Sequence, residues 1–196
     1  RKIYMIDNHD TGGNLRGDYN VWGPPGSGKT TFLANQVRKI VENYGSDSVM
    51  IASLTRAAAA EIVGRNLPLP RHSTGTLHAH CFRAMGSPEI AETKISEWNS
   101  ISNSRHHLSG SDGNIDDAFS EHSGKMPGDA LMQEYQTLRV RMAPRDEWPE
   151  KIRVFADRWN GFKDERGYFD FTDLIDYCLR DVDVAPGAPQ FLIIDE

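Results

Sequence analysis

The stretch Gly23-Pro24-Pro25-Gly26-Ser27-Gly28-Lys29-Thr30 decides the fold class of this chain. It matches the pattern GxxxxGK[ST] at every fixed position, after an expected short strand at residues 19–22 and at the start of an expected helix over residues 29–44. Glycines in such a loop let backbone N–H groups point at phosphate oxygens, and the helix start adds partial positive charge. The stretch predicts a phosphate-binding loop rather than a glycine turn that only caps a helix.

The motif gives each residue of this loop an expected role. Lys29 would neutralise the β- and γ-phosphates of a nucleoside triphosphate, and the Thr30 hydroxyl would ligate Mg²⁺. The other loop residues, and the threonine that follows them, would surround the phosphates. The expected nucleotide-binding residues are Gly23, Pro24, Pro25, Gly26, Ser27, Gly28, Lys29, Thr30 and Thr31.

The segments after the loop alternate between strand and helix patterns. Residues 48–54 are a mostly apolar run of strand length, and residues 57–63 are an alanine-rich helix former. A third short strand is expected at residues 73–77, followed by a helix that Gly86 closes. This alternation predicts an α/β fold, a parallel sheet with crossover helices on both faces.

Residues 87–165 have a different character. Helices are expected at residues 130–142 and 150–162 with no strand pattern between them, which indicates a helical insertion. Within it, residues 99–128 are dense in Ser, Gly, Asn and His, so we expect a mobile loop there.

The last part of the chain predicts a helix and then a strand. Asp170 is a plausible N-cap with Asp173 at N3, and the helix carries an apolar stripe. The apolar run at residues 191–194 predicts a buried parallel strand that ends in Asp195-Glu196. The stripe consists of Phe171, Leu174, Ile175, Cys178 and Leu179.

An acidic pair at that place points to nucleotide hydrolysis. Open α/β sheets bind ligands at the carboxyl ends of their strands. Asp195 would hold Mg²⁺, and Glu196 would orient and deprotonate the attacking water. Such a pair alone is more often a solvated turn, but the phosphate loop upstream favours the catalytic interpretation. The residues thus indicate an Mg-ATP or Mg-GTP hydrolase.

Composition is that of an ordinary globular protein. The 196 residues are 38% hydrophobic and 26% charged, which excludes collagen, coiled coil and full disorder. The two cysteines, Cys81 and Cys178, lack CxxC spacing, which argues against a disulfide framework and favours a reducing, cytoplasmic setting. No apolar run approaches the ~18 residues of a membrane span. Because the chain begins without Met, we expect a fragment.

Charge is distributed unevenly along the chain. The net charge is −6, with +4 on residues 1–85 and −10 on residues 86–196. A uniform basic coat for duplex DNA is therefore absent, although a local basic face in the first part stays open.

Four segments together resemble superfamily one helicases of the UvrD/Rep/PcrA type. Besides the phosphate loop, residues 51–62 resemble their motif Ia, and residues 75–78 with 81–82 resemble their motif Ib. Residues 170–175, DFTDLI, resemble the DFxDL helix that precedes their Walker B strand. The segments occur in the family's order and frame a helical insertion where the family has one.

The resemblance implies a RecA-like motor domain that couples ATP hydrolysis to movement along single-stranded DNA. Residues 1–86 would be its first part, residues 87–165 an inserted helical subdomain, and residues 166–196 its second part, ending at Walker B. Lys29 and Glu196 would be the catalytic residues of an ATP-dependent DNA helicase. No membrane is implied.

The resemblance also implies contacts to DNA. Thr55 and Arg56 would lie on the DNA path as motif Ia does, and Thr76 and His78 would contact the strand as motif Ib does. Hydroxyls and basic side chains can bind phosphates without reading sequence. Thr55 as a helix N-cap is a second interpretation that is compatible with the first. The alternative of a zinc site around His78 has no second half at zinc-site spacing.

The chain departs from the family in several places. No glutamine precedes Gln36, so adenine specificity rests on the family alone. The second RecA-like domain, whose arginine can raise the rate about 10³- to 10⁵-fold elsewhere, is missing. We therefore expect residues 1–196 alone to bind nucleotide weakly, to hydrolyse it poorly and not to unwind duplexes.

Two other functions stay open. The first is a P-loop ATPase or kinase that acts on a non-nucleic-acid substrate, whose turnover would be indifferent to DNA. The second is a nucleotide-gated binding module, which would bind ATP without turnover.

Overall fold

The computed structural model describes residues 3–7, 19–21, 23–24, 26–110 and 126–195. The chain divides into two compact units. The sheet unit consists of residues 1–84 and 181–196, and the helical unit consists of residues 85–180. In the described parts of the chain, no helix is long and apolar enough to cross a membrane.

The sheet unit contains a five-stranded sheet in the order β2-β1-β5-β3-β4. Neighbouring strands β5, β3 and β4 are parallel, which confirms the predicted α/β fold with a parallel sheet. β1 runs antiparallel to both of its neighbours, and the sequence analysis assigned no strand there. The strands are β1 (Ile3–Asp7), β2 (Tyr19–Asn20), β3 (Val49–Ser53), β4 (Thr74–Thr76) and β5 (Phe191–Asp195).

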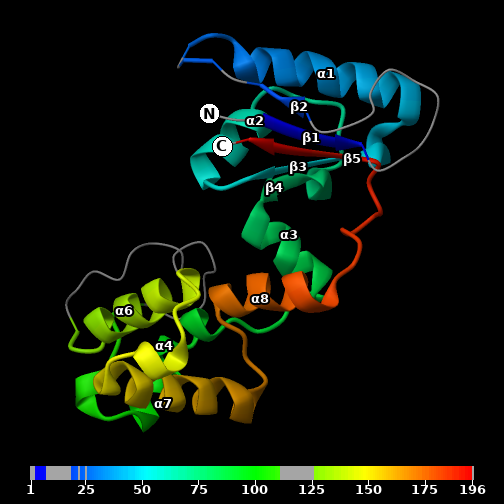
Figure 1. Ribbon diagram of the computed structural model, residues 1–196. Helices are drawn as coiled ribbons and strands as arrows, with labels where there is room; N and C mark the ends of the chain where they lie inside the picture. Colours follow the sequence, from blue (N-terminus) through cyan, green and yellow to red (C-terminus); the bar gives the residue numbers. More distant parts are fainter. Residues whose placement is uncertain (1–2, 8–18, 22, 25, 111–125, 196) are drawn as a thin grey trace. The chain divides into compact units, whose positions relative to one another are not determined.

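Three helices flank this sheet at the places where the sequence predicts them. They are α1 (Lys29–Tyr44), α2 (Arg56–Val63) and α3 (Leu77–Ala84). Figure 1 shows α1 on one side of the strands and α3 on the other. The apolar faces of α1 and α2 pack on β3 and β5 to form the core of this unit. Its fully buried members are Leu33, Val37, Ile40, Val49, Ile51, Ile62, Phe191 and Ile193.

The helical unit has its own core, rich in aromatic side chains. The α-helices among its described residues are α4 (Ile95–Ile101), α6 (Asp129–Val140), α7 (Glu150–Arg166) and α8 (Phe171–Asp181). All of α8 except its last residue belongs to this unit. Trp98 and Trp159 pack edge to face with ring centroids 5.1 Å apart. Short 3₁₀ turns at Ser46–Ser48, Arg71–Ser73, Ala91–Thr93, Ser104–His106 and Arg145–Glu147 complete the two units.

The first part of the segment 99–128, where the sequence predicts a mobile loop, contacts the helical core. Leu108 is buried in the helical core, and its backbone N–H and C=O bond to the side chain of Asn99 at 2.8 and 2.9 Å. Trp98 Nε1 donates to the carbonyl of His106 at 2.8 Å. These contacts hold residues 99–110 against the core, and residues 111–125 lie outside the described residues.

The second boundary between the units differs from the expected one. The sequence analysis placed residues 166–196 together in the motor domain, whereas residues 166–180 are part of the helical unit. Ion pairs and backbone hydrogen bonds attach this segment to the helical unit. Asp170 at the start of α8 binds Arg139 of α6 and Lys163 of α7, and Phe169 exchanges backbone hydrogen bonds with Glu89 and Ala91.

Candidate functional site

Glycine gives the phosphate loop its shape. Gly26 and Gly28 have φ of +77° and +83°, a backbone region that other residues rarely adopt. A Cβ added at either would meet nothing within 4 Å, so these two residues leave an open cradle above the loop. Gly23 is needed for close approach, because its Cβ would lie 2.4 Å from Ser27 Oγ.

The two polar residues that begin α1 are buried. Lys29 and Thr30 are each 8% exposed. Lys29 Nζ donates to the carbonyl oxygens of Gly23 and, at 2.8 Å, Pro24. The ammonium group is therefore held inside the loop, where the phosphates of a nucleotide would need a cation.

A cavity of about 580 Å³ opens over this loop. Six of the nine expected nucleotide-binding residues line it, and Gly23 and Pro24 contact Lys29 instead, while Pro25 lies outside the described residues. Sequence reasoning missed Glu61 and Arg65, which lie four residues apart at the end of α2 and complete the wall. Among the described residues the lining is Gly26, Ser27, Gly28, Lys29, Thr30, Thr31, Glu61 and Arg65.

Strand register brings the other predicted segments to one edge of the sheet. Ser53 at the end of β3 pairs with Thr76 at the end of β4 on one side and with Asp195 at the end of β5 on the other. Asn20, at the end of β2 and just before the phosphate loop, pairs with Tyr4, which in turn pairs with Ile194. The phosphate loop and the motif Ia-like, motif Ib-like and Walker B-like segments thus all lie at the carboxyl ends of their strands, on the same side of the sheet.

Asp195 and Thr30 carry the kinds of oxygen donor that Mg²⁺ takes. Asp195 is completely buried at the end of β5, and Thr30 lines the cavity over the loop. A carboxylate and a hydroxyl suit Mg²⁺, which takes one or two protein oxygens together with phosphates and waters. Among the residues described, no group of three or more His, Cys, Asp and Glu side chains could hold a metal. Glu196 lies outside the described residues.

Two of the four expected DNA-contacting residues cap helices. The Thr55 side chain accepts from the N–H of Ala58 at 3.2 Å, which confirms its interpretation as the N-cap of α2. Thr76 accepts from the N–H of Ala79 at 3.2 Å in the same way at α3. Arg56 is exposed in the first turn of α2, and burial lowers the pKa of the half-buried His78.

A neighbouring histidine has a purely structural role. Arg83 donates to His80 Nδ1 at 3.0 Å, so His80 is neutral with its proton on Nε2, which then donates to the carbonyl of Ile51 at 2.9 Å. Burial lowers its pKa, and the hydrogen bond to Ile51 only partly offsets this. His80 therefore ties α3 to β3, and both of its ring nitrogens are occupied.

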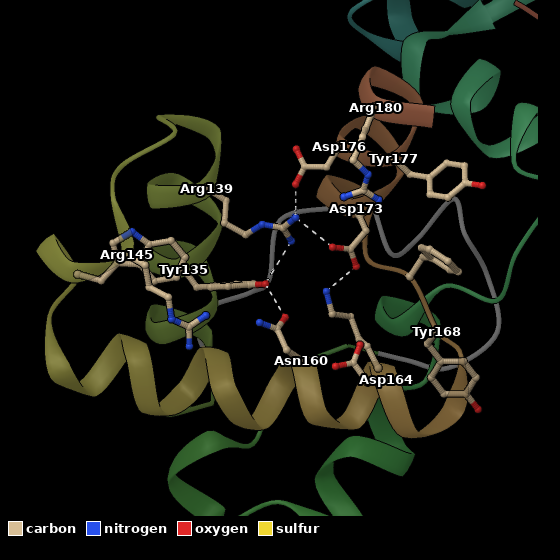
Figure 2. Close-up of a pocket in the computed structure, with 13 residues that line it drawn as sticks. Tyr135, Arg139, Arg145, Asn160, Asp164, Tyr168, Asp173, Asp176, Tyr177 and Arg180 are labelled. Atoms are coloured by element: carbon tan, nitrogen blue, oxygen red, sulfur yellow. Dashed lines mark hydrogen bonds and ion pairs between the residues drawn. The ribbon is translucent and has the colours of Figure 1, made fainter. Parts of the chain in front are cut away.

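The helical unit contains a second cavity, of about 470 Å³, next to the DFTDLI segment (Figure 2). Asp170 and Asp173 form a reciprocal N-terminal cap of α8, because each carboxylate accepts the backbone N–H of the other at 2.8 Å. This confirms the predicted cap. The same carboxylates bind Lys163 and Arg139. Figure 2 shows Arg139 reaching towards Asp173 and Asp176.

The charges of this cluster balance one another. Burial acts to raise the pKa of Asp170, but the positive charges of Lys163 and Arg139 outweigh it and hold that pKa below its ordinary value. Arg139 also donates to the Tyr135 hydroxyl, which donates to Asn160 at 3.0 Å. The motif-like acids thus fasten α8 within the helical unit.

The whole chain can be compared with known families. A family model described as an AAA domain matches residues 17–196, from just before β2 to the last residue. No curated protein and no solved structure gives a significant match. An AAA domain of this kind is a P-loop NTPase domain, which implies ATP hydrolysis. Because the match covers nearly the whole chain, the chain belongs to the AAA-domain family of P-loop NTPases.

Proposed function

We propose that this chain is the ATP-hydrolysing motor domain of a DNA helicase or translocase, which couples ATP turnover to movement along single-stranded DNA. The observation that supports the proposal best is that Ser53 pairs with Asp195 on one neighbouring strand and with Thr76 on the other. This backbone pairing brings the hydrolytic segment next to both DNA-path segments. The AAA domain of this family is found in UvrD/Rep-like helicases, which agrees with the sequence resemblance.

In the proposed reaction the chain's own groups bind and orient the nucleotide. Lys29 neutralises the terminal phosphates from its buried position in the loop. Thr30 and Asp195 would hold Mg²⁺, which would draw charge from the phosphate oxygens. Glu196 orients the attacking water and accepts its proton. A second RecA-like domain would supply the arginine that stabilises the transition state, so the chain alone turns over slowly.

The DNA strand would run along the carboxyl ends of β3 and β4. Thr55 and Arg56 come just after β3, and Thr76 and His78 come at the end of β4 and in the first turn of α3. Hydroxyls and an arginine at helix starts bind phosphate oxygens without reading bases. His78 is neutral at pH 7 because burial lowers its pKa, so it would act as a hydrogen-bond partner rather than as a cation.

The first test is steady-state ATP hydrolysis by the longest natural polypeptide that contains this chain, with and without single-stranded DNA. Glu196→Gln serves as the blank for the chemical step, and Lys29→Ala serves as the blank for binding. We expect turnover to rise at least about tenfold with DNA and to vanish in both variants. Turnover indifferent to DNA would instead assign a P-loop ATPase or kinase with another substrate. ATP binding without any turnover would assign a nucleotide-gated module.

DNA contacts are tested by equilibrium binding to an oligo-dT strand over a range of salt concentrations. We expect Arg56→Ala to lower the slope of log K against log salt by about 0.7, the value for one phosphate contact on single strands. The double variant Thr76→Ala/His78→Ala should weaken binding, whereas Thr76→Ser, which keeps the cap of α3, should not. Arg38→Ala, at an exposed arginine of α1, is the matched charge control. Unchanged DNA binding in the double variant would overturn the assignment of the motif Ib-like segment.

A further inference from the structure

The cavity over the phosphate loop has one wall that the phosphate-loop motif does not account for. Arg65 and Glu61 form this wall, and they are paired through Arg65 Nη2 and Glu61 Oε1 at 3.3 Å. Arg65 Nη1 also donates to the hydroxyl of Thr31 at 3.2 Å. This hydrogen bond places the guanidinium group of Arg65 directly against the first turn of α1. The contact is at Thr31, which lies two residues after Lys29 in the chain.

The pairing leaves part of the arginine's bonding capacity unused. A guanidinium group has five N–H donors in a fork that matches two oxygens of a phosphate. Arg65 Nε–H is buried and has no acceptor among the described residues. The Arg65 side chain is still 34% exposed, and that of Glu61 is 45% exposed. The present contacts therefore hold the guanidinium at the cavity without satisfying it.

A cation at this place counters the charge of Glu61. Glu61 puts a carboxylate into the wall of a cavity that is expected to hold a polyanion, and like charges in such a site repel. Arg65 offsets this repulsion and adds attraction of its own. Lys29 is held by the carbonyls of Gly23 and Pro24, and the lysine of such a loop reaches the β- and γ-phosphates. A nucleotide bound with its terminal phosphates at Lys29 would direct the phosphates nearer the nucleoside to the Thr31 side.

We propose that Arg65 is a nucleotide-binding residue whose guanidinium contacts the phosphate chain in the portion that ADP and ATP share. Glu61 is a positioning residue that holds the guanidinium at the cavity wall. The inference deepens the proposed function and rests on nucleotide binding at the loop.

The test measures dissociation constants of Mg-ADP and Mg-ATP by calorimetry on the full chain, with Glu196→Gln as the background so that ATP survives. We expect Arg65→Ala to weaken both nucleotides about tenfold, the factor for one charge-assisted hydrogen bond. Arg65→Lys should recover only part of the loss, because an ammonium group cannot present two parallel donors. Arg38→Ala should leave both constants unchanged. A loss confined to ATP would overturn the placement at the shared phosphates.

A second variant separates direct contact from charge compensation. If Arg65 only neutralised Glu61, Arg65→Ala/Glu61→Gln would bind nucleotide as the background does, and this result would overturn the proposal. With direct contact, the double variant stays weak. Thermal unfolding without nucleotide should be the same for Arg65→Ala and the background, because the pair is partly exposed. A background protein that binds neither nucleotide would refute the proposed function itself, whereas binding unaffected by Arg65→Ala would refute this inference alone.

Discussion

Glu92 is a buried acid that stays protonated at neutral pH. It lies in the 3₁₀ turn Ala91–Thr93, is 2% exposed, and accepts the N–H of Phe171 at 3.2 Å through one oxygen. Its other oxygen has no hydrogen-bond partner among the described residues. Burial, and then the negative charge of Asp170, raises the pKa of Glu92 to about 8. The helical unit therefore contains a buried carboxyl group that is uncharged at neutral pH.

This raised pKa predicts a pH-dependent stability. The stabilisation by neutral Glu92 is complete below about pH 4.5, where the unfolded chain also binds the proton, and it is lost as pH rises to about 8. Glu92→Gln keeps a neutral side chain at every pH. We expect this variant to be about 4 kcal/mol more stable than wild type at pH 8 and equally stable at pH 4, by urea unfolding followed through tryptophan fluorescence. A difference that is the same at both values would contradict the assignment.

α8 is held by charges at its first turn as well as by part of its apolar stripe. Of that stripe only Leu174 is fully buried, and Leu179 is 74% exposed. The side chains of Lys163 and Asp170 are 5% and 3% exposed and their charged atoms are 2.6 Å apart. The apolar stripe predicted this helix correctly, but it did not predict the ion pairs that attach its first turn.

Removing one partner of this buried pair should be costly. We expect Lys163→Met to lower the free energy of unfolding by about 3–5 kcal/mol, because it leaves a buried carboxylate short of a counter-charge. Lys151→Met is the matched control on the same helix, since Lys151 and Glu134 are 64% and 38% exposed. That control should change the free energy of unfolding by less than about 1 kcal/mol. Equal losses in urea unfolding of the two variants would show that the cluster is no more important than a surface pair.

Helix and strand boundaries were predictable where a local signal marks them. α1 begins and ends at the predicted residues because the phosphate loop precedes Lys29 and Gly45 follows Tyr44 with φ of +88°. α7 continues to Arg166, beyond the predicted residue 162, because its left-handed stop is Gly167. Strand β1 was missed, since antiparallel pairing with β5 joins residues far apart in the chain.

Two separate cores predict two separate responses to nucleotide. The phosphate loop belongs to the sheet unit, while Trp98, Trp148 and Trp159 belong to the helical core. Ligand at about 100 times its dissociation constant stabilises the structure that binds it by about 2.7 kcal/mol. We expect Mg-ATP to slow hydrogen exchange about 100-fold in peptides from α1 and β3 and to leave peptides from α4 and α7 unchanged.

The measurement is exchange followed by mass spectrometry, with Lys29→Ala as the control that should lose the effect. Equal slowing in the peptides of both units would mean that they unfold as one cooperative structure. Slowing that persists in Lys29→Ala would mean that ATP binds elsewhere than the phosphate loop.

Local patterns were enough to predict the phosphate loop, the helices that carry the motifs and the class of the fold. Glycine positions, capping residues and hydrophobic period act between neighbours in the chain, so they can be read from the sequence. Thr76, Ser53 and Asp195 meet in one row, and Arg65 meets Thr31, only after the strands pair and α2 packs. These contacts join residues that are 23 to 142 positions apart in the printed sequence. They depend on loop closure and on packing over the whole sheet unit, and no local pattern encodes either.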